Sequence, residues 1–261
     1  ISDNILVSQG LILWKPKGIH FTNYMEVLKM KGLGNSALIS VGRTVLGTVL
    51  NVFGTAFLGY ALGKQDLWGR KFWDRFVIIT MYFNAGIIPW FINMKNLGLT
   101  NNFLAYIIPG IISPFSLILF KTYAENLPAS LEESAQLDGA GYGVLFLKII
   151  MPLCKPIVAT IAVFSAVGQW NSFTDTLFLM SDSRYYTLQF ILYQYLNEAN
   201  AIANSLRSSM ENGIAADPSL LITPTAIKMT VSMVVVLPIL FVYPLFQRYF
   251  VSGIMIGAVK G

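Results

Sequence analysis

The chain of 261 residues has one cysteine, Cys154, and one histidine, His20. A single cysteine excludes an internal disulfide and a zinc site built from cysteine pairs. One histidine leaves little basis for a histidine-based catalytic or metal site. Charged residues are also scarce, at 12% of the chain, whereas soluble domains average about 25%. Because no nucleophile–base pair or metal cluster is apparent, the sequence argues against an enzyme, and we expect no catalytic or metal residues.

Hydrophobic residues make up 55% of the chain and the mean hydropathy is +0.61. A chain this apolar, with long runs nearly free of charge, is typical of an all-α membrane protein. The net charge of +5 suits cytoplasmic lysines and arginines. No basic patch with interleaved aromatic residues appears, so we expect no nucleic-acid partner.

Five apolar segments are predicted to cross the membrane, since each is about as long as a span requires. They are residues 35–62, 76–94, 103–120, 157–180 and 224–246. Residues 1–34 are expected to form an extracytoplasmic lead-in with a short helix around Tyr24–Met30. The chain begins with Ile1 rather than methionine, and a further span before it would explain the odd span count.

The short loop Gly63–Arg75 fixes the expected orientation, because it is dense in lysine and arginine and such loops are typically cytoplasmic. The central loop, residues 121–156, then also lies in the cytoplasm. The loop formed by residues 181–223 lies outside, and it is too long for a simple turn. We expect it to carry a helix around Leu188–Ala203.

Two features inside the first predicted span concern packing. Gly59 and Gly63 are four residues apart, the spacing that lets helix backbones approach closely. The alternative is that these glycines simply face lipid. Arg43 lies about two turns inside the span, and we expect it either to reach the nearer interface or to pair within the bundle.

The central loop mixes acids, small residues and glycines between apolar segments. Leu131–Ala140 is predicted to be a helix with Ser130 as its N-cap, and Ser130 with Glu133 fits a capping box. Gly139 is predicted to stop the helix, and Tyr142–Ile150 to restart it with an apolar face. The loop is interpreted either as a docking surface for a partner or as a connector whose acids face water.

A resemblance to a known family favours the first interpretation. The run Glu133-Ser134-Ala135, then Gly139, then Ile149 with Met151-Pro152, resembles the EAA signature of bacterial ABC-importer permeases. Serine for the middle alanine and methionine for leucine are its departures, and both keep the size class. The run 170–173, WNSF, and the ending QRYFVSGIMIGAVKG are similar to permeases of the carbohydrate type, in particular the lipo-oligosaccharide, aldouronate and alginate group.

The resemblance implies a type I ABC-importer permease fold, with five transmembrane helices present of an expected six. It implies that the central loop holds a coupling helix, which docks on a cytoplasmic ATPase. Glu133 is the first candidate for a charge contact with that ATPase, and Gly139 for the turn. The full set of coupling candidates is Glu132, Glu133, Ser134, Ala135, Asp138, Gly139, Ala140 and Pro152.

The same resemblance implies partners and a location. We expect a second, homologous permease subunit, two ATPase subunits, an extracytoplasmic solute-binding protein, a saccharide substrate and membrane lipid. The chain has no phosphate-binding loop of the form GxxxxGK[ST], so ATP and Mg belong to the partner ATPase and no cofactor is expected in this chain. The expected location is the bacterial inner or plasma membrane, as a multi-pass protein.

The translocation path should be lined by polar and aromatic groups within the spans, because a lipid-facing amide is costly. The candidates are Asn84, Gln169, Trp170, Asn171 and Asp175, with Tyr82 and Asn51 weaker. The competing interpretation is that these groups form hydrogen bonds between helices. Two other functions stay open: an ABC permease for a non-sugar solute, and an ion-coupled secondary transporter.

Overall fold

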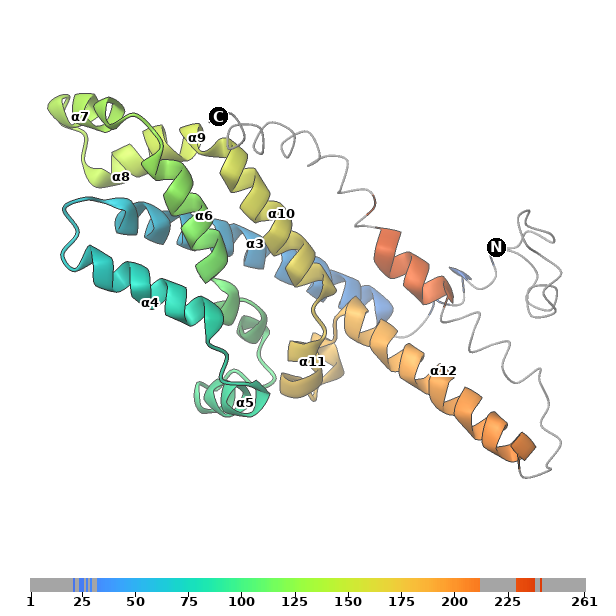
Figure 1. Ribbon diagram of the computed structural model, residues 1–261. Coiled ribbons are helices and arrows are strands. Elements are labelled where there is room, and N and C mark those ends of the chain that lie inside the picture. The colour runs from blue at the N-terminus through green and yellow to red at the C-terminus, as the bar shows by residue number, and fades with distance from the viewer. Residues whose placement is uncertain are drawn as a thin grey trace. The chain divides into compact units, whose positions relative to one another are not determined.

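Figure 1 shows the computed structural model of the chain. It describes residues 32–211, 229–237 and 240, together with 21, 24, 25, 27 and 29. Within these ranges the chain is built from helices joined by short turns. It divides into two compact units, the first made of residues 1–40 and 172–241 and the second of residues 41–171 and 242–261.

The longest helix, α3, runs from Leu33 to Gly63. At 1.5 Å per residue it is about 46 Å long, more than the hydrocarbon thickness of a bilayer. Among the described residues it is the one helix that is long and apolar enough to cross a membrane alone. Up to four spans result if each of three bent helix pairs is counted as one span.

The second predicted span, residues 76–94, is not a single straight helix. α4 (Arg70–Tyr82) and α5 (Ile87–Asn96) meet at a bend of 113°. Gly86 has a φ of +87° at the bend, a conformation that glycine adopts without steric cost. The side chain of Asn84 accepts a hydrogen bond from the Gly86 N–H at 2.9 Å, so the break has its own local hydrogen bond.

The third predicted span is also broken. Two 3₁₀ turns, Phe103–Tyr106 and Ile108–Gly110, precede α6 (Pro114–Glu125), and they meet it at 44°. Ser113 caps α6 by accepting a hydrogen bond from the Ser116 N–H. Pro114 then stands at the first helical position, where its missing N–H costs nothing.

The central loop folds as predicted in outline and differs in its capping. α7 spans Ala129–Leu137 and is preceded by Pro128, which makes no side-chain cap. The predicted N-cap at Ser130 and the capping box with Glu133 are therefore wrong. The helix begins earlier, directly after Pro128, whose own backbone is extended with φ −59° and ψ 125°.

After α7 the chain turns and becomes helical again through α8 (Tyr142–Val144), a π-helical segment (Leu145–Ile150) and α9 (Met151–Leu153). α10 (Lys155–Asn171) follows at a bend of 83°. Pro152 has no N–H to donate to the turn before it, and the widened π turn lies directly upstream.

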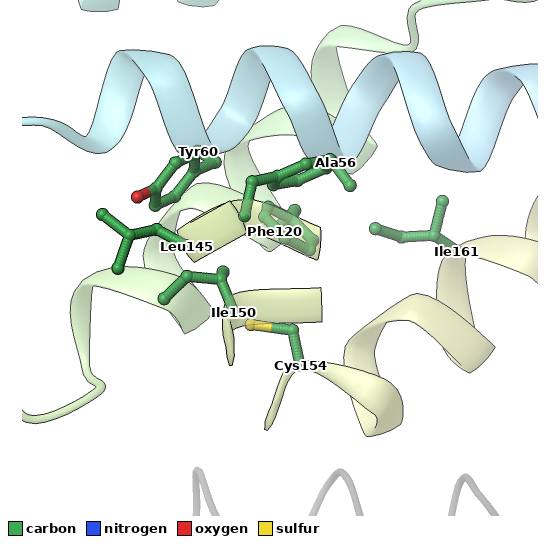
Figure 2. Close-up of a cluster of buried hydrophobic side chains, with 8 residues drawn as sticks. Ala56, Tyr60, Phe120, Leu145, Ile150, Cys154 and Ile161 are labelled. Carbon is green, nitrogen blue, oxygen red and sulfur yellow. The ribbon is translucent and has the colours of Figure 1, made fainter. Parts of the chain in front are cut away.

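The core of the second unit lies where these segments meet α3 (Figure 2). α3 contributes Ala56 and Tyr60 and α6 contributes Phe120, while the π-helical segment contributes Leu145 and Ile150. Phe146, Cys154 and Ile161 complete the buried cluster. The central loop is therefore packed on the membrane helices through the apolar face predicted for Tyr142–Ile150.

The first unit contains α11 (Thr174–Leu179), a 3₁₀ turn (Ser183–Tyr185) and α12 (Leu188–Glu211). The helix predicted around Leu188–Ala203 is confirmed and is longer than expected. The Ser40 hydroxyl near the start of α3 accepts a hydrogen bond from the Leu188 N–H at 2.8 Å. The predicted fifth span is described only at residues 229–237 and 240, all of them helical.

The lead-in is described at few positions, of which 24, 25 and 27 are helical. Most of the lead-in and the carboxyl-terminal tail lie outside the described residues. Which segments lie in the membrane, and on which side each loop lies, stays a prediction.

Candidate functional site

α7 has two chemically different sides. Ala135, and Ala140 just after the helix, pack against the buried core cluster, and Glu132 is half-buried. Glu133 and Ser134 are exposed, and so is Leu137, at 89% of its surface. A helix that fixes one side to the protein and presents acids and an apolar residue on the other has the form of a docking element.

The turn after α7 depends on Gly139, which has a φ of +83°. A Cβ atom added there would meet nothing within 4 Å. The glycine is therefore needed for its backbone conformation and not for close approach. Asp138 is exposed beside it, at the end of the helix.

Glu132 is held from inside the protein. Its carboxylate forms an ion pair with the Lys64 ammonium, which follows the end of α3. The Lys64 ammonium also lies over the Tyr60 ring, 4.1 Å from its centroid. Burial by itself lowers the pKa of Lys64, but the hydrogen bonds and charge interactions with Glu132 and Tyr60 together outweigh burial and raise the pKa overall.

Two residues of the predicted Gly63–Arg75 loop, Arg70 and Asp74, lie in α4 and form ion pairs with α6. Arg70 lies 2.6 Å from Glu125, and Lys121 pairs with Asp74 and lies 3.7 Å from Glu125. These charges are partly buried, so they are screened less than surface pairs. The dense basic loop that predicted orientation therefore also ties helices together.

α3 is approached closely along its glycines. A Cβ on Gly59 would lie 3.1 Å from the Phe120 ring and 3.2 Å from the Leu117 carbonyl oxygen. A Cβ on Gly54 would lie 2.8 Å from Ile111. The prediction of close helix packing is confirmed for Gly59, where the lipid-facing alternative is wrong. At Gly63 a Cβ would make only ordinary contacts, the nearest with Glu125 at 3.7 Å.

Arg43 pairs within the bundle, one of its two expected outcomes. Its side chain is 2% exposed, and its Nε and Nη2 donate to the Gln169 Oε1 at 3.2 and 3.0 Å. Its guanidinium also lies 4.3 Å from the Tyr106 ring centroid. A buried guanidinium requires such partners, because burial without them is very costly.

Amides on α3 and α10 bond to the carbonyls of the broken third span. Asn51 donates to the Gly110 oxygen at 2.7 Å, and Gln169 donates to the Tyr106 oxygen at 3.3 Å. In a membrane, carbonyls left by a helix break need partners from neighbouring helices. For Gln169 and Asn51, the competing interpretation as interhelical hydrogen bonds therefore has direct support.

A cavity of about 330 Å³ opens beside this cluster. Its lining combines hydroxyl, amide and phenyl groups, from Asn51, Ser113, Phe115, Ser116, Phe164 and Ser165. The Asn51 amide and the Ser113 hydroxyl already have partners within the protein.

The other path candidates are dispersed. Asn84 lies exposed in the break between α4 and α5. Trp170 and Asn171 end α10 beside Gln169. Asp175 belongs to the first unit, where it accepts hydrogen bonds from the Ser172 hydroxyl and the Thr176 N–H. The assignment of these residues to a translocation path stays a prediction.

Sequence reasoning missed Lys64 as a site residue. It was noted only as part of a basic loop, and its partner lies 68 residues further along the chain. Opposite charges at that separation give no local pattern. Buried hydroxyls such as Thr55, which accepts from the Ser113 N–H at 3.4 Å, were missed for the same reason.

Comparison with known proteins defines the class. The family model described as "Binding-protein-dependent transport system inner membrane component" matches residues 55–256. The chain is 31% identical to a chain in a solved structure, with a TM-score of 0.82, covering 96% of this chain and 86% of that one. That structure is described as a bacterial ABC transporter involved in the import of the acidic polysaccharide alginate.

Curated relatives of similar sequence point to the same class of protein. The chain is 35% identical over 257 residues to the polygalacturonan/rhamnogalacturonan transport system permease protein YtcP of Bacillus subtilis, covering 98% of this chain and 87% of the relative. It is 37% identical over 246 residues to protein LplC of the same organism, covering 94% and 81%.

The fold and these matches define a permease subunit of an ABC importer, a multi-pass protein of the bacterial cell membrane. The chain belongs to the family of binding-protein-dependent transport system inner membrane components. The resemblance drawn from the Glu133–Gly139 run and the WNSF run is thereby confirmed, and the alternative of an ion-coupled secondary transporter does not fit.

Proposed function

We propose that this chain is the permease subunit of an importer that carries an oligosaccharide or polysaccharide delivered by an extracytoplasmic binding protein. The observation that best supports coupling of transport to an ATPase is that α7 has two different sides. Its inner side is packed and ion-paired to the chain, and its outer side presents Glu133, Ser134 and Leu137. The outer side is the surface on which a cytoplasmic ATPase docks.

The energy for transport comes from ATP and Mg held by that ATPase. Closure of an ATPase pair moves α7, and the packed core carries the movement into the membrane helices. A second, homologous permease subunit completes the path, and the two subunits alternate between inward-facing and outward-facing states. Rigid transmission requires that α7 move as one body with the core beneath it.

Support for the substrate class comes from the relatives. Proteins similar over nearly the whole chain are named for polygalacturonan and rhamnogalacturonan transport, and for import of alginate. Hydroxyl, amide and aromatic groups in the path would suit a saccharide, since amides bond to hydroxyls and rings stack on sugar faces. An ABC permease for a non-sugar solute is the alternative to be tested.

The test is uptake into proteoliposomes that contain this chain, its partner permease, the ATPase pair and the binding protein. Labelled oligogalacturonides and neutral arabino-oligosaccharides are compared with a labelled amino acid, with ATP or ADP inside the vesicles. We expect ATP-dependent uptake of a saccharide only. Amino-acid uptake, or no response of the ATPase to any glycan with its binding protein, would contradict the proposal.

A further inference from the structure

The ion pair between Lys64 and Glu132 lies at the junction between the longest membrane helix and α7. Lys64 comes directly after Gly63, the last residue of α3. Glu132 lies in the first turn of α7. The pair therefore joins the end of α3 to a helix that stands 68 residues further along the chain.

This pair is partly withdrawn from water. The exposed fractions of the Lys64 and Glu132 side chains are 21% and 28%. The rings of Tyr60 and Tyr142 lie near the Lys64 ammonium, at 4.1 and 5.6 Å from their centroids. Aromatic faces attract a cation and exclude water from it, so they favour one fixed position for the ammonium.

The neighbouring acid Glu133 has a different environment. It is exposed on the outer side of α7, whereas Glu132 points toward α3. Adjacent residues on a helix are about 100° apart, so one acid can be held inside while the other stays available to a partner. The two acids of the Glu132-Glu133 run therefore have separate roles.

Apolar contacts hold α7 against the core but do not fix its orientation there. Ala135 and Ala140 touch the core cluster with small side chains, and dispersion contacts of this kind are weakly directional. A hydrogen-bonded ion pair has a preferred geometry. Lys64 supplies that constraint at the amino-terminal end of α7, where no side-chain cap is present.

We propose that Lys64 is a positioning residue that holds α7 to the end of α3, so that a displacement of α7 is passed directly into the membrane helix. The inference rests on the proposed role of α7 as the ATPase-docking element. Lys64 itself does not contact the ATPase. Without it, α7 still binds the ATPase but moves partly independently of α3.

The experiment compares Lys64→Met with Lys71→Met in the fully assembled transporter. Lys71 is an exposed lysine of the same loop region, so it controls for loss of a positive charge. Retention of the ATPase on an affinity column and the amount of solute carried per ATP hydrolysed are both measured. We expect Lys64→Met to retain the ATPase and to lower solute per ATP about threefold to tenfold. Lys71→Met should match the wild type in both.

Three further variants keep the test decisive if Lys64→Met folds poorly. Lys64→Arg keeps the charge, and Lys64→Glu combined with Glu132→Lys reverses the pair. Both should recover most of the solute carried per ATP, whereas Lys64→Glu alone should not. Normal coupling in Lys64→Met, or no recovery in the reversed pair, would overturn the proposal. Loss of the ATPase from Lys64→Met would show instead that Lys64 belongs to the docking surface, which leaves the proposed function standing.

Discussion

Gln169 on α10 accepts two hydrogen bonds from the buried guanidinium of Arg43 on α3 and donates one to the Tyr106 carbonyl oxygen. One amide thus joins two helices to a broken third. The relationship explains how a charged residue is tolerated in an apolar helix, because the charge lies inside the bundle and has partners. It also gives Gln169 a structural role, whether or not solute passes close to it.

Removing either partner should destabilise the protein. Arg43→Met leaves the Gln169 oxygen without its donor, and Gln169→Leu leaves the guanidinium without this acceptor. We expect each to cost about 1–3 kcal/mol. The double variant should cost clearly less than the sum, since the two changes remove one shared interaction. Thermal unfolding in detergent measures all three, and strict additivity would show that the two residues do not interact.

Because α3 and α6 are closely packed at Gly59, a larger side chain at this position should destabilise the protein. Gly59→Leu forces a side chain against Phe120 and the Leu117 backbone, and we expect a cost of about 1–3 kcal/mol. Gly168→Leu on α10 is the matched control, because a Cβ there meets nothing within 4 Å. The control should unfold at or above the wild-type temperature, since leucine favours helix over glycine. Equal stability of the two variants would contradict the packing of α3 against α6.

The turn at Gly139 should tolerate some residues and not others. Gly139→Val places a β-branched residue at a positive φ, which costs about 1–2 kcal/mol in local strain. Gly139→Asn should cost less, because asparagine adopts this conformation more readily. We expect the valine variant to bind the ATPase less well than the asparagine variant, as measured by co-purification. Equal binding would mean that the turn does not set the docking geometry.

Cys154 should make stability depend on alkaline pH. Burial raises the pKa of this thiol from 9.0 to about 11. The folded state therefore holds the thiol proton more tightly than the unfolded state does. The contribution of the thiol to the free energy of unfolding is fully present below pH 9. As the pH rises toward 11, the free energy of unfolding falls by about 2 kcal/mol.

Cys154→Ala is the control for that titration, because lysines and tyrosines also change charge in the same range. The difference in unfolding temperature between wild type and Cys154→Ala should shift in favour of the variant between pH 9 and 11. A difference that stays constant across this range would show that the thiol titrates normally.

Local patterns in the sequence predicted a good part of the fold. α7, the turn at Gly139 and the apolar face of residues 142–150 all follow from residues close together in the chain. The bend at Gly86 was harder to foresee, since glycine is also tolerated inside membrane helices. The cap of α7 was predicted at the wrong residue, because the helix begins directly after Pro128, two positions before the predicted cap.

The candidate site was less predictable, because its key contacts join distant residues. Pairing within the bundle was one of two outcomes expected for Arg43, but nothing near it indicated Gln169, and the pairing of Lys64 with Glu132 was not expected at all. A contact with a residue distant in the sequence also separates the roles of Glu132 and Glu133 in α7. Both were candidates for an ATPase contact, and the structure holds Glu132 inward and leaves Glu133 exposed.

The central claim is that the outer side of α7 docks the ATPase, and co-purification after a charge reversal at Glu133 tests it most directly. Glu133→Lys is compared with Asp66→Lys, which reverses an exposed acid in the Gly63–Arg75 loop. We expect Glu133→Lys to release the ATPase, with an affinity loss of about tenfold or more, and Asp66→Lys to retain it. Retention of the ATPase at wild-type affinity by Glu133→Lys would contradict the account.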